Sequence, residues 1–468
     1  MNNEQRKLFP GDKYAGIFST GKAGNNPVSK KILATFRFQM QHPENSYDVI
    51  VIGAGAAGLI AAGRAAELGA RVLLLEKMER PARKLLITGK GRCNITNDRS
   101  VPEFLQHVHP NGRILRYAFS QFYQQEMLEL LHQNGLETKL ERGGRYFPVS
   151  DKASDVADAL LNWNKKNRVT LQTRTQVKEI GITDNRVAGV RINDNPITDK
   201  LIHAPAVILA TGGKSYPATG STGEGYALAE QCGHTVTPVR PALVPLETAE
   251  PIPEPLLDLT LKNINTVLWV DGKKAGEAFG ELMFIPAGLS GPTLITLSRT
   301  AVDALLKKQQ VTVTIDLKPA LDEQKLDARL LRDLNANGTK TIRNLFPSWV
   351  PRPLVPVFLD ILKLDPSKAC HQVTSGDRKA IRYLLKNWKF TITRPRPYKE
   401  AIVTAGGVRV NEIDQKTMGS KKVTGLYLAG EVLDLDGDTG GYNLQIAWST
   451  GWMAGDAAAN SLRRKSTS

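Results

Sequence analysis

The feature that most constrains the fold is an apolar run that ends in three spaced glycines. Residues 49–52 are alternating Val and Ile, as expected of a strand buried on both faces of a parallel sheet. Gly53, Gly55 and Gly58 follow with G-x-G-x-x-G spacing. In this motif the first glycine permits a tight turn, the second lets the backbone approach a pyrophosphate, and the third lets the next helix pack closely on the sheet. The stretch therefore predicts a dinucleotide site at a helix N-terminus.

The residues after the motif carry the pattern that such a site requires. Small apolar side chains recur at helical spacing over residues 57–68, and Gly69 is placed to end the helix. A second apolar run over residues 72–75 closes on Glu76, about 20 residues after the glycines, where a carboxylate can bind an adenosine ribose. A glycine motif alone could be an ordinary turn. The strand, helix and acid together favour a doubly wound, Rossmann-like α/β domain.

Composition restricts the class of protein. A chain of 468 residues is long enough for two or three domains, and none of its apolar runs predicts a membrane span. Cys93, Cys232 and Cys370 are far apart and form no C-x-x-C pair, so we expect a cytoplasmic protein without a disulfide framework or a metal site. The net charge of +16 suits a polyanion, but no nucleic-acid-binding module accompanies it. We therefore do not expect nucleic acid to be the main partner.

The chain divides into four predicted segments. Residues 1–46 carry little periodicity and are expected to be a flexible extension, in which Met40 offers an alternative translation start. Residues 47–239 form the first part of the dinucleotide-binding domain, and 401–468 complete it. Between them, 240–400 begin with clustered prolines and continue with short strands, including a hairpin turn at residues 271–272, and with helical stretches at about 320–365. This pattern indicates an inserted β-rich unit with a helical piece.

The other elements are predicted with less support from motifs. Apolar periodicity favours one helical stretch over residues 113–134 and another over 151–163, with Ser150 as its N-cap. Strands are expected over 169–177 and 186–192, with a turn between them.

Aromatic residues interleave with basic ones between residues 378 and 399. Tyr383, Trp388 and Phe390 could mimic a stacking surface for RNA, but their spacing favours core anchors with charged outer faces.

Further glycine-containing stretches are expected at the same crevice, because parallel strands end there. One apolar strand stops at Thr211 and Gly212, and another stops at Gly430 and Glu431. The small, basic loop over residues 83–97 can pass close to a planar ligand. The glycines at 440–441 open a helix whose N-terminus suits the negative charge that grows on a reduced flavin.

These motifs resemble those of a known family. GKGRCNITN (89–97), TGSTGEGY (219–226), GLSGP (288–292) and GEVLDLDGDTGGYNLQ (430–445) are similar to the BaiN/YhiN family of NAD(P)/FAD-dependent oxidoreductases, which are glutathione-reductase-like flavoproteins. The similarity runs from residue 47 to about 455. It implies a discontinuous Rossmann-like FAD-binding domain that is interrupted by a small β-barrel and a helical subdomain.

The residues and the resemblance together give a predicted set of cofactor-binding positions. They are Gly53, Gly55, Ala56, Ala57 and Gly58 for the pyrophosphate, Glu76 and Lys77 for the ribose, Val177 for adenine, Arg83, Arg92, Cys93 and Asn94 along the flavin, Thr211, Gly212 and Gly430 at the crevice, Glu431 for the ribitol, and Gly441, Tyr442, Asn443 and Leu444 for the isoalloxazine.

One departure from the family concerns the substrate pocket. Where the family has a threonine and a histidine after a phenylalanine, this chain has Ile285, Pro286 and Ala287 after Phe284. A role for that histidine is therefore absent here.

The resemblance implies an enzyme in which FAD exchanges a hydride with an organic substrate, with reduction of a conjugated C=C bond as the main hypothesis. NAD(P)H would be a transient reductant, because the chain has no second G-x-G-x-x-G motif. An amine oxidase that uses oxygen, and a basic flavoprotein that binds or modifies RNA, are the alternatives.

The catalytic acid or base is not identified by the sequence. Flavin chemistry needs few protein groups. Tyr216, Arg92 and Tyr442 are candidate substrate contacts, whereas His107 and His109 have no ligand-spaced partner nearby and are expected to be surface histidines.

Overall fold

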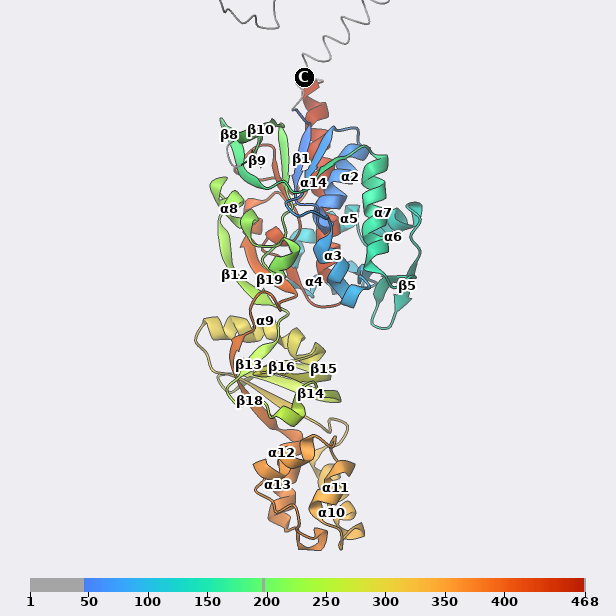
Figure 1. Ribbon diagram of the computed structural model, residues 1–468, viewed down its shortest axis with the longest axis vertical. Helices are drawn as coiled ribbons and strands as arrows, with labels where there is room; N and C mark the ends of the chain where they lie inside the picture. Colours follow the sequence, from blue (N-terminus) through green and yellow to red (C-terminus); the bar gives the residue numbers. More distant parts are fainter. Residues whose placement is uncertain (1–45, 196–197, 467–468) are drawn as a thin grey trace, which may run out of the picture. The chain divides into compact units, whose positions relative to one another are not determined.

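The computed structural model describes residues 46–195 and 198–466 (Figure 1). The predicted extension up to residue 45, including Met40, lies outside the described residues. Within the described part of the chain, no helix combines the length and the apolar character needed to cross a membrane.

A five-stranded parallel sheet forms the centre of the dinucleotide-binding fold. Its order is β20 (Leu426–Leu428), β11 (Ala206–Leu209), β1 (Val49–Ile52), β2 (Val72–Leu75) and β7 (Thr170–Gln172). All four residues of β1 are buried, which explains the unbroken apolar run. The predicted strands before and after the glycine motif are thus confirmed, and β1 lies in the middle of the sheet.

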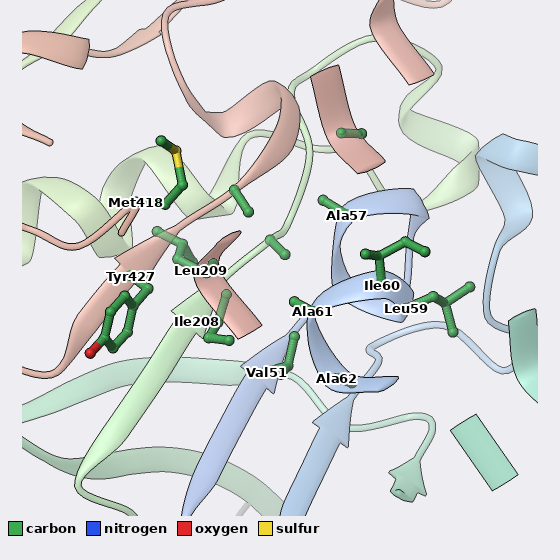
Figure 2. Close-up of a cluster of buried hydrophobic side chains, with 14 of the residues drawn as sticks. Val51, Ala57, Leu59, Ile60, Ala61, Ala62, Ile208, Leu209, Met418 and Tyr427 are labelled. Atoms are coloured by element: carbon green, nitrogen blue, oxygen red, sulfur yellow. The ribbon is translucent and has the colours of Figure 1, made fainter. Parts of the chain in front are cut away.

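Helices α2 (Ala56–Glu67) and α14 (Tyr442–Ser466) pack against each other beside this sheet (Figure 1). The contact is close because small residues face each other. A Cβ on Gly451 would lie 2.4 Å from the Ala57 carbonyl oxygen, and one on Gly455 would lie 2.3 Å from the Ala61 oxygen. Figure 2 shows Ala57 and Ala61 on α2, with Ala61 near Val51 of β1. We call this contact the α2–α14 seam.

Smaller sheets and helices complete the dinucleotide-binding fold. The antiparallel sheets comprise β8 (Val177–Thr183), β9 (Arg186–Asn195) and β10 (Thr198–His203), then β3 (Thr96–Asn97), β6 (Arg145–Pro148) and β5 (Thr138–Glu141), and the pair β4 (Val108–His109) and β21 (Asp436–Gly437). The helices are α3 (Arg83–Ile87), α4 (Val101–Leu105), α5 (Arg116–Gln121), α6 (Gln124–Gln133), α7 (Ala153–Lys166) and α8 (Glu224–Gln231).

The predicted β-rich insert is a closed six-stranded barrel. Its strands are β13 (Leu246–Thr248), β16 (Gly288–Ser290), β15 (Lys273–Ile285), β14 (Thr260–Val270), β17 (Val311–Asp316) and β18 (Trp388–Pro395). The hairpin turn at residues 271–272 joins β14 to β15 as expected. β12 (Val236–Ala242) precedes the barrel in the chain and β19 (Val403–Val408) follows it, and these two strands pair in antiparallel fashion. The domain boundaries at 240 and 400 remain a prediction.

Helix α9 (Pro292–Leu306) packs on the barrel, and four more helices form the helical piece. These are α10 (Glu323–Ala336), α11 (Ile342–Leu345), α12 (Leu354–Ile361) and α13 (Ser375–Lys386). Trp388 and Phe390 are core residues as expected, but Tyr383 is 67% exposed.

The predicted helical stretch over 113–134 is interrupted. Phe122 is extended, with a φ of −152°. Its ring is buried and stacks on Trp452 at a centroid distance of 4.3 Å. The Tyr123 backbone N–H then donates to the Glu126 carboxylate and starts α6 anew. A tertiary aromatic contact therefore outweighs local helical periodicity at this point.

Two further expectations about boundaries are wrong. Ser150 is not the N-cap of α7, because Asp151 adopts a left-handed φ of 56° and the N-cap is Lys152. The expected strand over 169–177 is two elements: β7 joins the parallel sheet, and Val177 begins β8. The turn at residues 184–185 does connect β8 to β9.

Candidate active site

One large cavity of about 1440 Å³ lies at the end of β1 and β2. Its walls come from the glycine motif, from the segments over residues 82–99 and 211–224, from the start of α14, and from the insert. The insert residues are Phe279, Gly280, Glu281, Pro292 and Thr296. Segments that are distant in the sequence thus surround one space. Except for Gly58 and Cys93, every predicted cofactor-binding residue lines it.

Each of the three motif positions requires glycine for a different structural reason. Gly53 has a φ of 100°, which favours glycine, and a Cβ on Gly58 would lie 1.8 Å from the Gly53 carbonyl oxygen. Both are therefore needed by the fold itself. Gly55 has an ordinary extended backbone, and a Cβ there would meet no atom within 4 Å. Since Gly55 lines the cavity, its missing side chain leaves room for a ligand, as a pyrophosphate requires.

Glu76 is held at the cavity edge by the backbone. Its carboxylate accepts hydrogen bonds from the N–H groups of Ala54 (3.0 Å) and Met78 (2.8 Å). Next to it, the Lys77 ammonium lies 2.9 Å from the Glu224 carboxylate and donates to the Thr222 hydroxyl at 2.7 Å. Both predicted ribose-binding residues are therefore at the cavity, and Lys77 also fixes the loop that precedes α8.

Glu431 ties together several walls of the cavity. One carboxylate oxygen accepts from the Ser215 hydroxyl (3.0 Å) and the Thr404 N–H (2.8 Å), and the other lies 2.6 Å from the Lys84 ammonium. Lys84, in the basic stretch over residues 83–97, is therefore neutralised by a protein carboxylate. Nothing in one sequence indicates this pairing across 347 residues.

Neighbouring residues of the basic stretch differ in whether they reach the cavity. Arg92 lies over the Phe147 ring at 4.1 Å and forms ion pairs with Glu141 and Asp151. Cys93 does not reach the cavity: it is fully buried, and burial raises the pKa of its thiol to about 12. The structure therefore leaves Cys93 in the core and offers no thiolate for chemistry at the cavity.

The start of α14 is fixed by hydrogen bonds between asparagine side chains and backbone groups. In the orientation that satisfies its neighbours, the Asn94 side-chain oxygen accepts from the Gly441 N–H at 3.0 Å. The Asn443 side chain accepts from the Gly437 N–H (2.8 Å) and donates to the Gly437 oxygen (2.7 Å). This end of the helix is thereby held against the cavity, where Tyr442 and Leu444 also lie.

On the remaining walls, Val177, Thr211, Gly212, Tyr216 and Gly430 all line the cavity. The Thr211 hydroxyl is buried and has no hydrogen-bond partner among the described residues. A buried hydroxyl in that state is a group that a ligand can satisfy.

One polar group at the cavity was not predicted from the sequence. His107 and His109 were expected at the surface, but each is about one-third exposed and both face Asp438, at 2.8 Å and 3.4 Å. His107 and Asp438 line the cavity, as does Arg99. No spacing rule pairs residues 331 positions apart, so the sequence held no signal for this contact.

These residues fit FAD. A glycine cradle with free space, a fixed acid at the end of the second strand, and a helix N-terminus lie around one cavity, which is what a dinucleotide needs. When bound, FAD supplies hydride transfer, and the protein supplies orientation and electrostatics. The assignment of individual residues to parts of FAD remains a prediction. Fold and cavity together define a Rossmann-type, FAD-dependent oxidoreductase.

Comparisons with known proteins agree with this class. A family model described as the HI0933-like protein Rossmann domain matches residues 47–457, and the chain belongs to this family. A ribosomal RNA dihydrouridine synthase from Escherichia coli (strain K12) is 32% identical over 407 residues, covering 87% of this chain and 96% of the relative. A 3-dehydro-bile acid delta(4,6)-reductase from Clostridium scindens is also 32% identical, over 417 residues, covering 87% and 98%. A ribosomal RNA dihydrouridine synthase from Haemophilus influenzae is 28% identical over 428 residues, covering 91% and 100%. The family, the fold class and the cofactor expected from the sequence are confirmed.

Proposed function

We propose that this protein reduces a carbon–carbon double bond conjugated to a carbonyl group, with NAD(P)H as the transient source of electrons for FAD. The main support is that relatives with different names act on, or form, compounds of the same chemical class. A 3-dehydro bile acid with Δ4,6 unsaturation has double bonds conjugated to its 3-oxo group. Dihydrouridine is uridine saturated at the ring double bond that is conjugated to a carbonyl. The common substrate class is an α,β-unsaturated carbonyl compound.

The walls of the cavity support a planar substrate. Phe279 of β15 lines the cavity and is 67% exposed, so its ring is available as a stacking surface. The insert also contributes Gly280, Pro292 and Thr296. A flat unsaturated ring would then lie between the insert and the walls that are expected to hold FAD.

The decisive experiment separates the two half-reactions. Protein loaded with FAD is mixed anaerobically with NADH or NADPH, and flavin absorbance is followed. We expect bleaching by at least one nucleotide, then rapid reoxidation by a 3-oxo-4-ene steroid or a simple cyclic enone. If neither nucleotide bleaches the flavin, the reductase proposal fails. Reoxidation by oxygen after reduction with amines, but not with nucleotides, would favour the amine-oxidase alternative.

RNA is the second candidate substrate, and a specific observation favours it. Lys90, Arg99, Arg142 and Arg145 all line the cavity, and two relatives are named for ribosomal RNA. Basic side chains at this place suit the phosphates around a target uridine. In the same reoxidation assay, we expect a ribosomal RNA transcript to gain dihydrouridine, which mass spectrometry detects. Added salt should lower the yield, because it weakens RNA binding.

The basic helix α13 is a poorer candidate for RNA contact. Its Arg378 and Arg382 both pair with Asp327, and Lys386 pairs with Asp316. These cations are already neutralised by acids, so we propose that α13 is not the contact surface despite the exposed Tyr383 ring.

Phe279→Ala tests the stacking surface. We expect KM for a cyclic enone to rise about 10-fold, as loss of one stacking contact predicts, with FAD content and the rate of bleaching by nucleotide unchanged. Phe279→Tyr should restore KM, because the ring is kept. Leu306→Ala is the matched control, since Leu306 is also an exposed apolar side chain of the insert (64%) but does not line the cavity. An unchanged KM in Phe279→Ala would remove the ring from the substrate site.

We also propose that the protein works in a reducing compartment such as the cytoplasm. The support is that Cys93, Cys232 and Cys370 are all unpaired and buried. Fractionation of the native cells would test this.

A further inference from the structure

A short two-stranded ladder brings an acid to a histidine at the cavity. β4 pairs with β21, and just beyond this pair the Asp438 backbone N–H donates to the His107 carbonyl oxygen at 3.0 Å. The Asp438 carboxylate lies 2.8 Å from Nδ1 of the same histidine. Main chain and side chain thus both hold His107 to Asp438, and Asn443 donates to the Asp438 carbonyl oxygen at 3.2 Å.

The His107 ring is held by protein at Nδ1, and the residue lines the cavity. The ring packs beside Tyr442 at a centroid distance of 4.7 Å, and its side chain is 31% exposed. Both His107 and Asp438 line the cavity, whereas His109 does not. Among the described residues, Nε2 of His107 has no hydrogen-bond partner, so this atom is available to a ligand.

The carboxylate determines which ring nitrogen carries a proton. Burial favours the neutral acid, but the hydrogen bonds and charges of His109 and His107 outweigh it and lower the pKa of Asp438 below its usual value. An ionised carboxylate only accepts hydrogen bonds, so Nδ1 must donate. When the ring also carries a second proton, that proton resides on Nε2.

We propose that His107 is the catalytic proton donor of the reductase and that Asp438 is its positioning residue. This inference rests on the proposed function. Hydride addition to the β-carbon of an α,β-unsaturated carbonyl breaks the C=C π bond and leaves a negative charge on the carbonyl oxygen. The Nε2–H bond breaks, its proton goes to that enolate, and the resulting enol rearranges to the saturated carbonyl. The substrate gains one hydride and one proton, and the neutral imidazole regains its proton from water.

Other charged groups face His107 and Asp438. His109 shares the Asp438 carboxylate, and the buried Asp436 lies in β21 but is paired with Arg299 at 2.7 Å. Arg99 lies near the Tyr442 hydroxyl, whose pKa is raised by burial. Because Asp436 is already neutralised by Arg299, Asp438 is the acid that acts on His107.

The test compares His107→Gln with a control histidine variant. We expect His107→Gln to bind FAD normally and to be bleached by NAD(P)H at the wild-type rate, but to be reoxidised by enone 100-fold or more slowly, as loss of a general acid predicts. Reoxidation by ferricyanide, which takes electrons without needing a proton on carbon, should not change. His132→Gln is the control, because His132 is exposed on α6 and does not line the cavity.

A measurement without turnover tests the dyad itself. In FAD-loaded protein carrying ¹⁵N-histidine, NMR shows which ring nitrogen of His107 carries the proton. We expect Asp438→Asn to move the neutral ring away from the Nδ1–H form. An unchanged tautomer would overturn the positioning role of Asp438.

Different results would show that the proposed function is wrong and that the proposed role of His107 is wrong. If the wild-type protein is not reoxidised by any enone or uracil substrate, the proposed function is wrong. If the wild-type protein is reoxidised and His107→Gln keeps that rate, the reductase stands and His107 is not its proton donor.

Discussion

Gly55→Val is expected to abolish retention of FAD while the apoprotein stays folded. Gly55 has φ −86° and ψ −166°, which any residue can adopt, and an added Cβ would meet no protein atom within 4 Å. The new side chain would instead occupy the cavity at the turn where the pyrophosphate is expected. We expect FAD affinity to fall at least 100-fold, about 2.8 kcal/mol, measured by calorimetry on apoprotein and by the flavin absorbance of purified protein.

Two other glycines make this result interpretable. Gly376→Val, in α13 and away from the cavity, should leave FAD binding unchanged. Gly58→Val should instead fail to fold, since even a Cβ there would lie 1.8 Å from a carbonyl oxygen. A Gly55→Val protein that is purified yellow, with one FAD per chain, would show that the motif does not contact the cofactor.

Gly455→Leu is expected to leave no folded protein. At the α2–α14 seam, a Cβ on Gly455 would lie 2.3 Å from the Ala61 oxygen. The opposing atom belongs to a helix backbone, so no change of rotamer relieves the overlap, and the helices would have to move apart. We expect Gly455→Ala to lower the free energy of unfolding by about 3 kcal/mol, at the upper end for overpacking. Gly455→Leu should accumulate in the insoluble fraction.

Denaturant unfolding of the alanine variant measures this cost. Asn460→Leu is the control, because Asn460 lies on the same helix but is partly exposed and bonds to Asp456. It should change stability little. A Gly455→Ala protein as stable as the wild type would mean that the seam is looser than the backbone contact indicates.

Local rules predicted the parts of the fold that depend on near neighbours in the chain. The glycine motif, its strand and its helix depend on residues within about one βα unit, and the hairpin at residues 271–272 depends on one turn. The helical stretch over 113–134 failed because Phe122 finds Trp452, 330 positions later, and leaves helical geometry to stack on it.

The residues of the candidate site also differ in how far local sequence predicted them. Residues on the glycine turns were predicted, because backbone conformation there dictates residue type. Lys84 with Glu431, and His107 with Asp438, were not, because charge pairing depends on which segments the fold brings together. Cys93 was misplaced because a left-handed φ of 61° turns its side chain into the core, while Arg92 and Asn94 remain at the cavity.

The α2–α14 seam has a consequence for how the protein is made. The glycine motif is synthesised early, but the edge strand β20 and the helix that covers α2 come from the other end of the described chain. A nascent chain therefore lacks one wall of the candidate cofactor pocket until α14 has left the ribosome. We expect a retained flavin to mark a chain whose translation has passed through α14.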